Sequence, residues 1–403
     1  LPHRNVVSWS ALIGGYIEEG KCHEALNCFE RMQREGLYPN EFTFTGILKA
    51  VGCVGAIDKG KQIHGEIASR GFLEKNIVLG TALVDMYAKC GVLEEAQHIL
   101  EELHFRDIVS WSSLIAGYAQ EGRGHEALTC FQLMQAEGLF PDSITFICIL
   151  KCSSNLGSID IGEQIHHSIS TMGLLEKDNI VLGTAVVDMY AKCGMLAKAQ
   201  ELLEELPIRD IVAWNALIGG YIHHGQGREA LTSFEHMKCE GYSPNIVTFI
   251  FILKACGILG SLEVGEDIDV EVRKQGLLQK NVVLGTALVD MYAKCGAQEK
   301  AREVFEQLPV RDVVSWNALI AGYTQYGLAD EALECFRKMQ DEGACPNSVT
   351  YISTLKACGL ARSLEIGKAI DAEVRKQGLL LKNIALGKTL VGMYAKCGEL
   401  IKA

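Results

Sequence analysis

The sequence of 403 residues lacks the signatures of several common protein classes. No stretch approaches the 18 consecutive apolar residues that a membrane-spanning helix needs, so we expect no membrane segment. It contains no C-x-x-C pair, no G-x-x-x-x-G-K-[ST] phosphate loop and no G-x-S-x-G turn. We therefore expect no zinc site, no cofactor and no small-molecule substrate.

An excess of basic residues is also missing. The chain has 38 Lys and Arg against 50 Asp and Glu, a formal net charge of −12. Non-specific nucleic-acid binding depends on neutralising phosphates with Lys and Arg. Any nucleic-acid binding must therefore use local basic positions together with contacts to bases.

Self-similarity is the strongest feature that is present. Four tryptophans, Trp9, Trp111, Trp214 and Trp316, lie 102, 103 and 102 residues apart. The text around them is nearly constant: VVSWSALIGGY, IVSWSSLIAGY, IVAWNALIGGY and VVSWNALIAGY. A fixed period of this kind predicts a repeat array rather than separate globular domains.

Each period divides into three pieces of about 35, 36 and 31 residues, so we predict one array over residues 1–403. The predicted repeats are 6–40, 41–76, 77–107, 108–142, 143–179, 180–210, 211–245, 246–281, 282–312, 313–347 and 348–383, with a partial repeat at 384–403. Residues 1–5 resemble the ends of the short pieces, so we expect the array to continue past both ends of this sequence.

Each piece has the pattern of two helices. In the first, apolar residues form two helical stripes, Trp9, Ile13 and Tyr16 and then Ala25, Phe29 and Met32. Gly36 and Pro39 then supply the signal for a helix end. A single hairpin of this kind cannot bury both faces and must stack on its neighbours. We predict an all-α fold, a right-handed superhelical solenoid of helix-turn-helix repeats.

Cysteine follows the same period. Of the fifteen cysteines, Cys90, Cys193, Cys295 and Cys397 recur once per period. This indicates small buried packing residues in a reducing compartment rather than disulfide partners.

One segment imitates a catalytic motif. His64 and Glu66 form an H-x-E pair of the kind found in zinc deaminases, but no C-x-x-C completes it. We predict no catalytic residues, no bound metal and no enzyme activity.

The repeated segments of this sequence resemble the pentatricopeptide repeat family of plant organelles. The segments TALVDMYAKCG at 81–91, EALTCFQLM at 126–134 and WNALIGGY at 214–221 are similar to its PLS subclass, in which standard, long and short repeats alternate. A tetratricopeptide array is the nearest alternative, but it has 34 residues throughout and a W-x2-L-G-x2-Y signature that is absent here.

The resemblance implies recognition of single-stranded RNA, one base per repeat, by the fifth and last residues of each repeat. In this chain those pairs are Ser10 with Asn40, Thr81 with Asp107, Ser112 with Asp142, Thr184 with Asp210, Asn215 with Asn245, Thr286 with Asp312, and Asn317 with Asn347. All are small and polar. Helix capping explains part of the preference at the last position.

The resemblance also implies a code, in which Ser or Thr selects purines and Asn selects pyrimidines. Asp only accepts hydrogen bonds, which suits the ring N–H of G and U, whereas Asn also donates. The array then reads A-n-G-G-n-G-Y-n-G-Y-n from 5′ to 3′. The long repeats have Thr45, Ile147, Ile250 and Ile352 as fifth residues, and we expect these repeats to space the RNA.

The resemblance implies two further sets of RNA-contacting residues. Val7, Val78, Val109, Val181, Val212, Val283 and Val314, the second residues, are similar to the family's base-sandwiching aliphatic residues, and ordinary core packing is the alternative. Lys89, Lys192, Lys294 and Lys396 are candidates for phosphate contacts, and solvated surface lysines are the alternative.

The function implied is an RNA-binding module that guides C-to-U editing or other RNA processing in a mitochondrion or chloroplast. A deaminase or other editing protein acting in trans would supply the chemistry. Two alternatives stay open: a protein-scaffolding solenoid, and a decayed gene fragment. The second arises because Lys388 stands where Thr is expected and Gly392 where Asp is expected.

Overall fold

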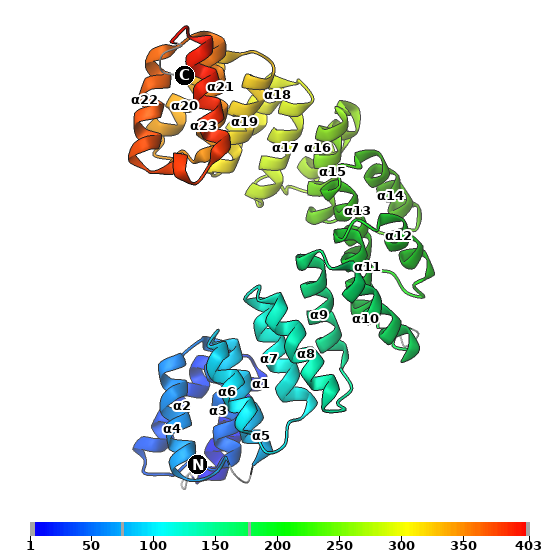
Figure 1. Cartoon of the computed structure of the whole chain (residues 1–403), viewed down its shortest axis with the longest axis vertical. Helices are drawn as coiled ribbons and strands as arrows, with labels where there is room; N and C mark the ends of the chain where they lie inside the picture. Colours follow the sequence, from blue (N-terminus) through cyan, green and yellow to red (C-terminus); the bar gives the residue numbers. More distant parts are fainter. Residues whose placement is uncertain (1–4, 74–75, 176–178, 400–403) are drawn as a thin grey trace. The chain divides into compact units, whose positions relative to one another are not determined.

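The computed structural model describes residues 5–73, 76–175 and 179–399, so most of the 1–5 segment lies outside the described residues. Within these ranges the chain is helical and contains no strand (Figure 1), which confirms the all-α prediction. The chain divides into two compact units, Leu1–Arg209 and Asp210–Ala403. No described helix is long and apolar enough to cross a membrane.

The helices alternate regularly along the chain. The first unit contains α1 (Val6–Glu18), α2 (Cys22–Arg34), α3 (Glu41–Val54), α4 (Ile57–Ser69), α5 (Ile77–Lys89), α6 (Leu93–Glu102), α7 (Ile108–Gln120), α8 (Gly124–Ala136), α9 (Ser143–Leu156), α10 (Ile159–Thr171), α11 (Ile180–Lys192) and α12 (Leu196–Glu205). The second unit contains α13 (Ile211–His223), α14 (Gly227–Cys239), α15 (Ile246–Leu259), α16 (Leu262–Lys274), α17 (Val282–Lys294), α18 (Gln298–Glu306), α19 (Val313–Gln325), α20 (Ala329–Asp341), α21 (Ser348–Ala361), α22 (Leu364–Lys376), the 3₁₀ helix η1 (Leu379–Leu381) and α23 (Ile384–Lys396).

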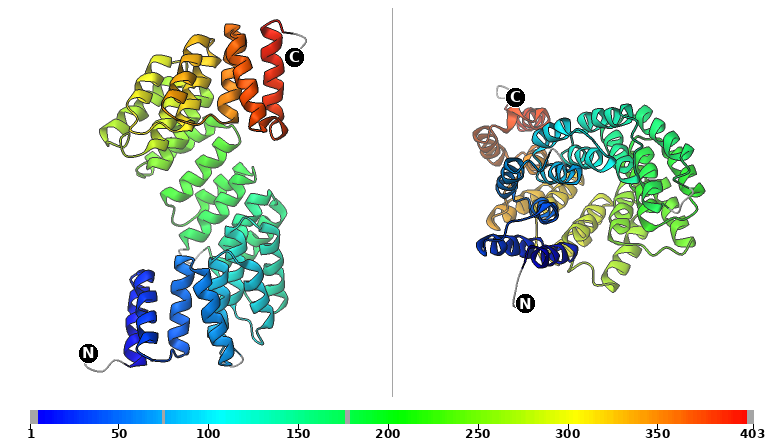
Figure 2. Two further views of the ribbon diagram at one scale, coloured as in Figure 1. Left: turned by 90° about the vertical axis from the view of Figure 1, so that its left-hand side faces the viewer. Right: turned by 90° about the horizontal axis from the view of Figure 1, so that it is seen from below.

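Odd-numbered helices, here called first helices, form a continuous layer within each unit. In the first unit α1 packs on α3, α3 on α5, α5 on α7, α7 on α9 and α9 on α11, and the second unit repeats the pattern from α13 to α23. Each even-numbered helix packs against the first helix before it (Figure 2). This layering is what stacked helical hairpins require.

The tryptophans at the centre of the period lie in the core. Trp9, Trp111, Trp214 and Trp316 are all at least 95% buried. Gly36 follows α2 with a φ of +74°, a left-handed conformation that glycine adopts without strain, so it ends the helix as predicted.

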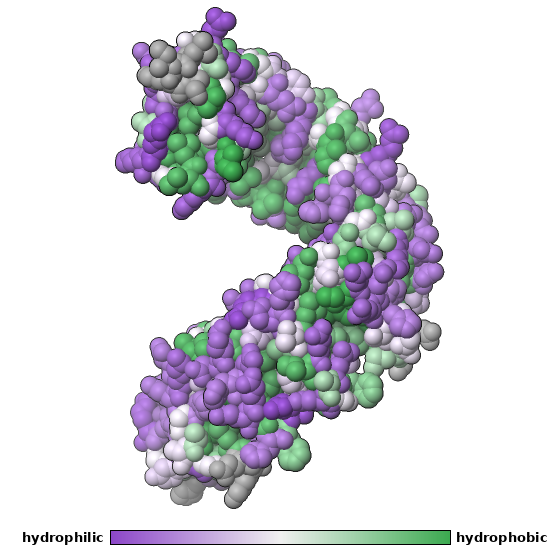
Figure 3. Space-filling view, viewed as in Figure 1, coloured by the Kyte–Doolittle hydropathy of each residue, from purple (hydrophilic) through white to green (hydrophobic). Residues whose placement is uncertain are grey.

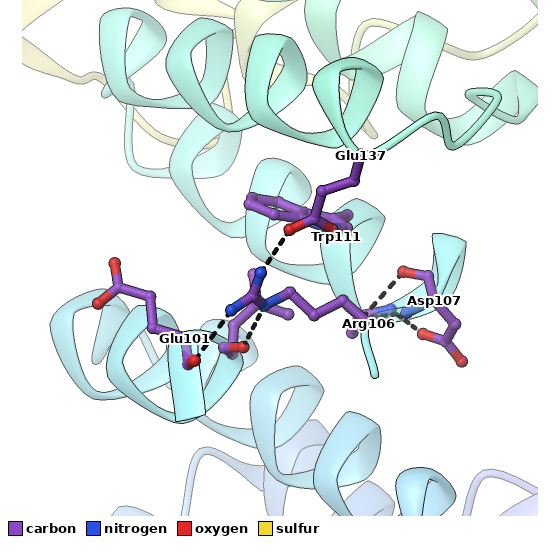
Figure 4. Close-up of polar contacts among 7 residues, drawn as sticks. Glu101, Arg106, Asp107, Trp111 and Glu137 are labelled. Atoms are coloured by element: carbon purple, nitrogen blue, oxygen red, sulfur yellow. Dashed lines mark hydrogen bonds and ion pairs between the residues drawn. The ribbon is translucent and has the colours of Figure 1, made fainter. Parts of the chain in front are cut away.

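An arginine clamp joins a short repeat to the standard repeat that follows it (Figure 4). Arg106 donates to the carbonyl oxygens of Leu100 and Glu101 at the end of α6, at 2.8 and 2.9 Å, and its guanidinium also pairs with Glu137. The other carboxylate oxygen of Glu137 accepts from the indole N–H of Trp111 at 2.9 Å. One arginine therefore satisfies a helix C-terminus and positions the core tryptophan of the next repeat.

The periodic cysteines differ in part from expectation. All fifteen cysteines are free, but the four periodic ones are half-buried rather than fully buried. Each directly follows the last residue of a first helix of a short repeat, where the helix end leaves its side chain partly open. Burial raises the pKa of the Cys90, Cys193 and Cys295 thiols, which makes them poorly reactive.

A buried tyrosine in each short repeat bonds to the long repeat before it, and the partner changes along the chain. The Tyr87 and Tyr190 hydroxyls lie 3.1 and 2.9 Å from Nδ1 of His64 and His166. In the second unit, Tyr292 and Tyr394 donate to Asp269 and Asp371, each at 2.8 Å. Burial lowers the pKa of both half-buried histidines below the ordinary value, because it disfavours the charged imidazolium.

We expect these histidines to make the first unit sensitive to acid. Their pKa is below the ordinary value of 6.5 in the folded chain, so the unfolded chain binds protons more readily. The stability they contribute is fully present above about pH 6.5 and is lost as the pH falls below it. His64→Gln with His166→Gln should therefore reduce the fall in the urea midpoint between about pH 7.5 and pH 5.5. Equal falls in variant and wild type would assign the acid sensitivity to other groups.

Candidate nucleic-acid interface

The last residue of each complete predicted repeat, like Asn5 before the first repeat, caps the next first helix. The caps are Asn5, Asn40, Asn76, Asp107, Asp142, Asn179, Asp210, Asn245, Asn281, Asp312, Asn347 and Asn383, and each side chain accepts a backbone N–H of the first turn. Capping therefore contributes to the Asn and Asp preference at this position. It also fixes where these side chains lie.

Four of the seven predicted pairs are connected by hydrogen bonds. Nδ2 of Asn215 donates to Oδ1 of Asn245 at 3.2 Å, and Asn317 makes the same bond to Asn347. The Thr81 hydroxyl donates to Asp107 at 3.4 Å. Ser10 and Asn40 are linked through one intervening hydroxyl, that of Thr43. The fifth and last residues of one repeat thus belong to a small polar cluster in these four cases.

The other three pairs are not connected in this way. Ser112 donates to the Ile108 carbonyl of its own helix at 2.7 Å instead of to Asp142. The hydroxyls of Thr184 and Thr286 are buried without a hydrogen-bond partner among the described residues. Thr184 belongs to the first unit and Asp210 to the second, so each is described separately.

Burial differs between the two positions of a pair. Ser10, Thr81, Ser112, Asn215, Thr286 and Asn317 are between 4% and 8% exposed. The last-position side chains are more open: Asn40, Asn245 and Asn347 are exposed, and Asp107, Asp142, Asp210 and Asp312 are half-buried. The accessible polar atoms of each pair therefore belong mainly to its last residue.

A threonine that the sequence analysis missed connects these clusters. It is the third residue of each long repeat: Thr43, Thr145, Thr248 and Thr350, all at most 1% exposed. The Thr43 hydroxyl lies 2.6 Å from that of Ser10, and Thr248 donates to Oδ1 of Asn215 at 2.8 Å. The recurrence of this threonine once per period could have marked it as a candidate from the sequence. Only the packing of the helices shows that its hydroxyl contacts the preceding repeat.

The second residues of the standard and short repeats are exposed aliphatic side chains in both units. Val7, Val78, Val109, Val181, Val212, Val283 and Val314 are between 56% and 70% exposed, so they are not core residues. Phe42, Ile144, Val247 and Val349, the second residues of the long repeats, are also exposed. Hydrophobic areas lie among the hydrophilic side chains on the face drawn in Figure 3. A regular exposed apolar position on every first helix offers flat contact area to a ligand.

Three of the four phosphate-candidate lysines are paired with an aspartate one turn earlier. Lys89, Lys192 and Lys294 each lie 2.7 Å from such a carboxylate, that of Asp85, Asp188 or Asp290. The fourth, Lys396, has Gly392 at that position and no ion pair among the described residues. Pairing neutralises much of the charge that the first three would offer to a phosphate.

A second lysine series, also missed, is better placed. Lys49, Lys151, Lys254 and Lys356 are the ninth residues of the long repeats and are all exposed. They lie seven residues after the exposed second residues, on the same stripe of the first helix. No ion pair involves them within the described ranges. At the last short repeat, Lys356, Lys388 and Lys396 line one hollow between α21 and α23.

The H-x-E residues and the fifth residues of the long repeats were also considered as candidates from the sequence. His64 bonds Tyr87 of α5, and Glu66 pairs with Arg70, the residue that caps the end of its own helix, so both H-x-E residues have structural partners. The described part of the chain contains no cluster of three His, Cys, Asp or Glu suited to a metal. Thr45, Ile147, Ile250 and Ile352 are half-buried, and Thr45 bonds the Glu41 carbonyl of its own helix.

Comparisons with known proteins identify the same repeats in the sequence. A model described as PPR repeat family matches residues 4–52, 106–155, 209–257 and 311–359, and one described as PPR repeat matches 81–108 and 184–211. Two pentatricopeptide repeat-containing proteins of Arabidopsis thaliana are each 34% identical, one named chloroplastic over 100% of this chain and one named mitochondrial over 99%. This chain spans 64% and 58% of their respective lengths.

Solved structures show the same fold. The pentatricopeptide repeat protein PPR10, crystallised in complex with an 18-nt psaJ RNA element, matches with a TM-score of 0.70 and 19% identity, over 92% of this chain and 61% of that one. PPR10 from maize matches with a TM-score of 0.61 and 19% identity, over 99% and 68%. Periodicity, helical layering and these matches agree, and the chain belongs to the PPR repeat family.

Proposed function

We propose that this chain binds single-stranded RNA, with one base at each standard and each short repeat. The observation that carries the proposal is the joining of fifth and last residues into polar clusters, each close in sequence to an exposed aliphatic residue. A base needs both: apolar contact for its faces and hydrogen-bonding groups for its edge. The buried hydroxyls of Thr184 and Thr286, which lack protein partners among the described residues, also support a ligand with polar edges.

Base selectivity follows from the last residue of each pair. An aspartate offers only acceptors, which suits the ring N–H of G or U. An asparagine whose oxygen is already occupied offers N–H donors, which suits the bare ring nitrogen of A or C. With purines at Ser and Thr and pyrimidines at Asn, the RNA would read A-n-G-G-n-G-Y-n-G-Y-n.

We further propose that Lys49, Lys151, Lys254 and Lys356, with Lys396, contact the phosphates. These lysines lack a carboxylate partner within the described residues, whereas Lys89, Lys192 and Lys294 are paired with aspartates. A lysine that is free to replace counterions contributes more to binding than one already neutralised. These phosphate-contacting lysines are few, as expected for a chain with a formal net charge of −12.

The cellular role that fits is a targeting module in a plant organelle. The relatives' names place them in chloroplasts or mitochondria, and PPR10 carries an RNA element in its crystal structure. The alternation of standard, long and short repeats suggests the PLS subclass. We infer that the array guides C-to-U editing or other RNA processing, while a deaminase or other editing protein supplies the chemistry.

Fluorescence anisotropy with labelled RNA tests the proposal. An RNA of the stated register should bind at least about tenfold more tightly than a permuted RNA of equal composition, since each mismatched base costs roughly 1–3 kcal/mol in comparable interfaces. Equal affinity for both RNAs, or no binding, would contradict the proposal. Binding of apolar peptides instead would favour a scaffolding role.

The same measurement across salt concentrations tests the lysine assignment. Changing Lys49, Lys151, Lys254 and Lys356 to Gln should reduce the slope of log K against log salt by up to about 2.8, at about 0.7 for each phosphate contact with a single strand. The matched control changes Lys89, Lys192 and Lys294 to Gln and should alter the slope less. A larger change in the control would reverse the assignment.

A further inference from the structure

The Asn–Asn pairs have one internally consistent arrangement of amide groups. The backbone N–H of Thr248 donates to Asn245 at 3.0 Å, so the amide atom of Asn245 at that point is its oxygen. The same oxygen accepts from Asn215 at 3.2 Å, so the Asn215 atom facing it is nitrogen. The Asn215 oxygen then faces the Thr248 hydroxyl at 2.8 Å and accepts from it. Reversing either amide would place two donors or two acceptors together.

The second pair repeats this arrangement. Asn347 accepts from the Thr350 backbone N–H at 3.1 Å and from Asn317 at 3.2 Å. The Thr350 hydroxyl donates to the Asn317 oxygen at 2.6 Å. Thr248 and Thr350 are 0% exposed, and each hydroxyl also lies 3.1 Å from the oxygen of Asn245 or Asn347, so it sits between the two amides of its pair. Two independent repeats with the same contacts make this a property of the sequence pattern.

The consequence concerns which groups remain for a ligand. In each pair both amide oxygens are occupied by protein donors, whereas Nδ2 of the exposed Asn245 or Asn347 has no hydrogen bond among the described residues. The accessible groups are therefore N–H donors. The Watson–Crick edge of C has a bare ring nitrogen that accepts from them, whereas the edge of U has a ring N–H that opposes them.

We propose that Thr248 and Thr350 are positioning residues that set base selectivity: their hydroxyls hold Asn215 and Asn317 so that each pair offers only donors and selects C over U. The inference rests on the proposed function and deepens it at two positions of the RNA. Thr248 and Thr350 belong to the long repeats that directly follow the Asn–Asn pairs. A long repeat that selects no base would therefore determine which base the preceding standard repeat selects.

The chain provides its own contrast. Thr145 occupies the matching place beside Ser112 and Asp142, and its hydroxyl donates to Asp142 at 2.7 Å. Ser112, however, bonds its own helix. A carboxylate presents acceptors whichever way it turns, whereas an amide presents a donor or an acceptor depending on its orientation. The hydroxyl should therefore matter for selectivity beside the Asn–Asn pairs and not beside Asp142.

The test is Thr248→Val, which removes the hydroxyl and nearly keeps the shape. Competition binding with RNAs that carry C or U only at the base facing Asn215 and Asn245 measures the preference. The wild type should prefer C by about tenfold, which corresponds to about 1.4 kcal/mol. The preference should fall to about threefold or less in the variant, because the Asn215 amide then keeps only its bond to Asn245 and is no longer held in one position. Thr248→Ser, which keeps the hydroxyl, should retain the full preference.

Two further variants separate positioning from folding. Thr350→Val should reduce the preference only at the base facing Asn317 and Asn347, and Thr145→Val should leave the preference for G at its own base unchanged. Undiminished selectivity in Thr248→Val would overturn the inference, as would an equal loss of affinity for C and U. A wild-type chain with no base preference at this position would instead contradict the proposed function itself.

Discussion

Replacing Gly322 with alanine is expected to lower the free energy of unfolding by about 1–3 kcal/mol, the usual cost of forcing an extra methyl group into a packed core. A Cβ at Gly322 would lie 2.5 Å from Cβ of Ala293 and 3.3 Å from Cα of Ala293 on the neighbouring first helix. Neither atom can move without moving the α17 backbone. The two first helices would therefore have to separate, which disturbs the layer on which every repeat depends.

Gly15 provides the matched control because it is the tenth residue of its repeat, as Gly322 is. A Cβ at Gly15 would meet no atom within 4 Å. Gly15→Ala should therefore be neutral or stabilising by up to about 1 kcal/mol, through the better helix propensity of alanine. Urea unfolding followed by circular dichroism measures both. Similar stability changes in the two variants would show that the close approach at Gly322 does not limit stability.

Much of the fold could be predicted because the same physical requirement recurs every period. Trp9 and its three counterparts are buried, and Gly36 ends α2 in the left-handed conformation. An apolar stripe at helical spacing and a glycine after it report directly on local structure, which a sequence expresses well. The handedness of the stack depends on small rotations between repeats, which no single residue specifies.

The candidate site was harder to predict, for identifiable reasons. Val7 and its counterparts have the composition of core residues, and only the positions of neighbouring helices show that they are exposed. The Thr248 hydroxyl contacts Asn215 in the repeat before it, a contact made by packing rather than by sequence proximity. By contrast, the pairing of Lys89 with Asp85 could have been predicted, although the sequence analysis did not include it, because residues four apart on a helix face each other.

The second large effect is a change of base preference at a single repeat. Asn215→Thr with Asn245→Asp would rebuild the combination found at Thr286 with Asp312. The introduced carboxylate would still accept the backbone N–H of Thr248, as Asp142 accepts that of Thr145 at 2.8 Å, so the helix cap should survive. The pair would then offer an acceptor where it offered donors, and the preferred base should change from C to G. A good base contact is worth roughly 1–3 kcal/mol, by analogy with bidentate pairs on DNA.

The control for this change lies in the same chain. Asn317 and Asn347 form the same type of pair and are left unchanged, so the preference at their base should stay as in the wild type. A change at both positions would indicate a general disturbance of the array rather than a local change of reading.

Competition binding of the Asn215→Thr, Asn245→Asp variant with four RNAs that differ only at the facing base tests the central claim most directly. We expect the preference for C over G to invert by about tenfold or more, while the total affinity for the best RNA stays similar. An equal loss of affinity for all four RNAs would show that these residues are only helix caps, and would contradict base reading by this array.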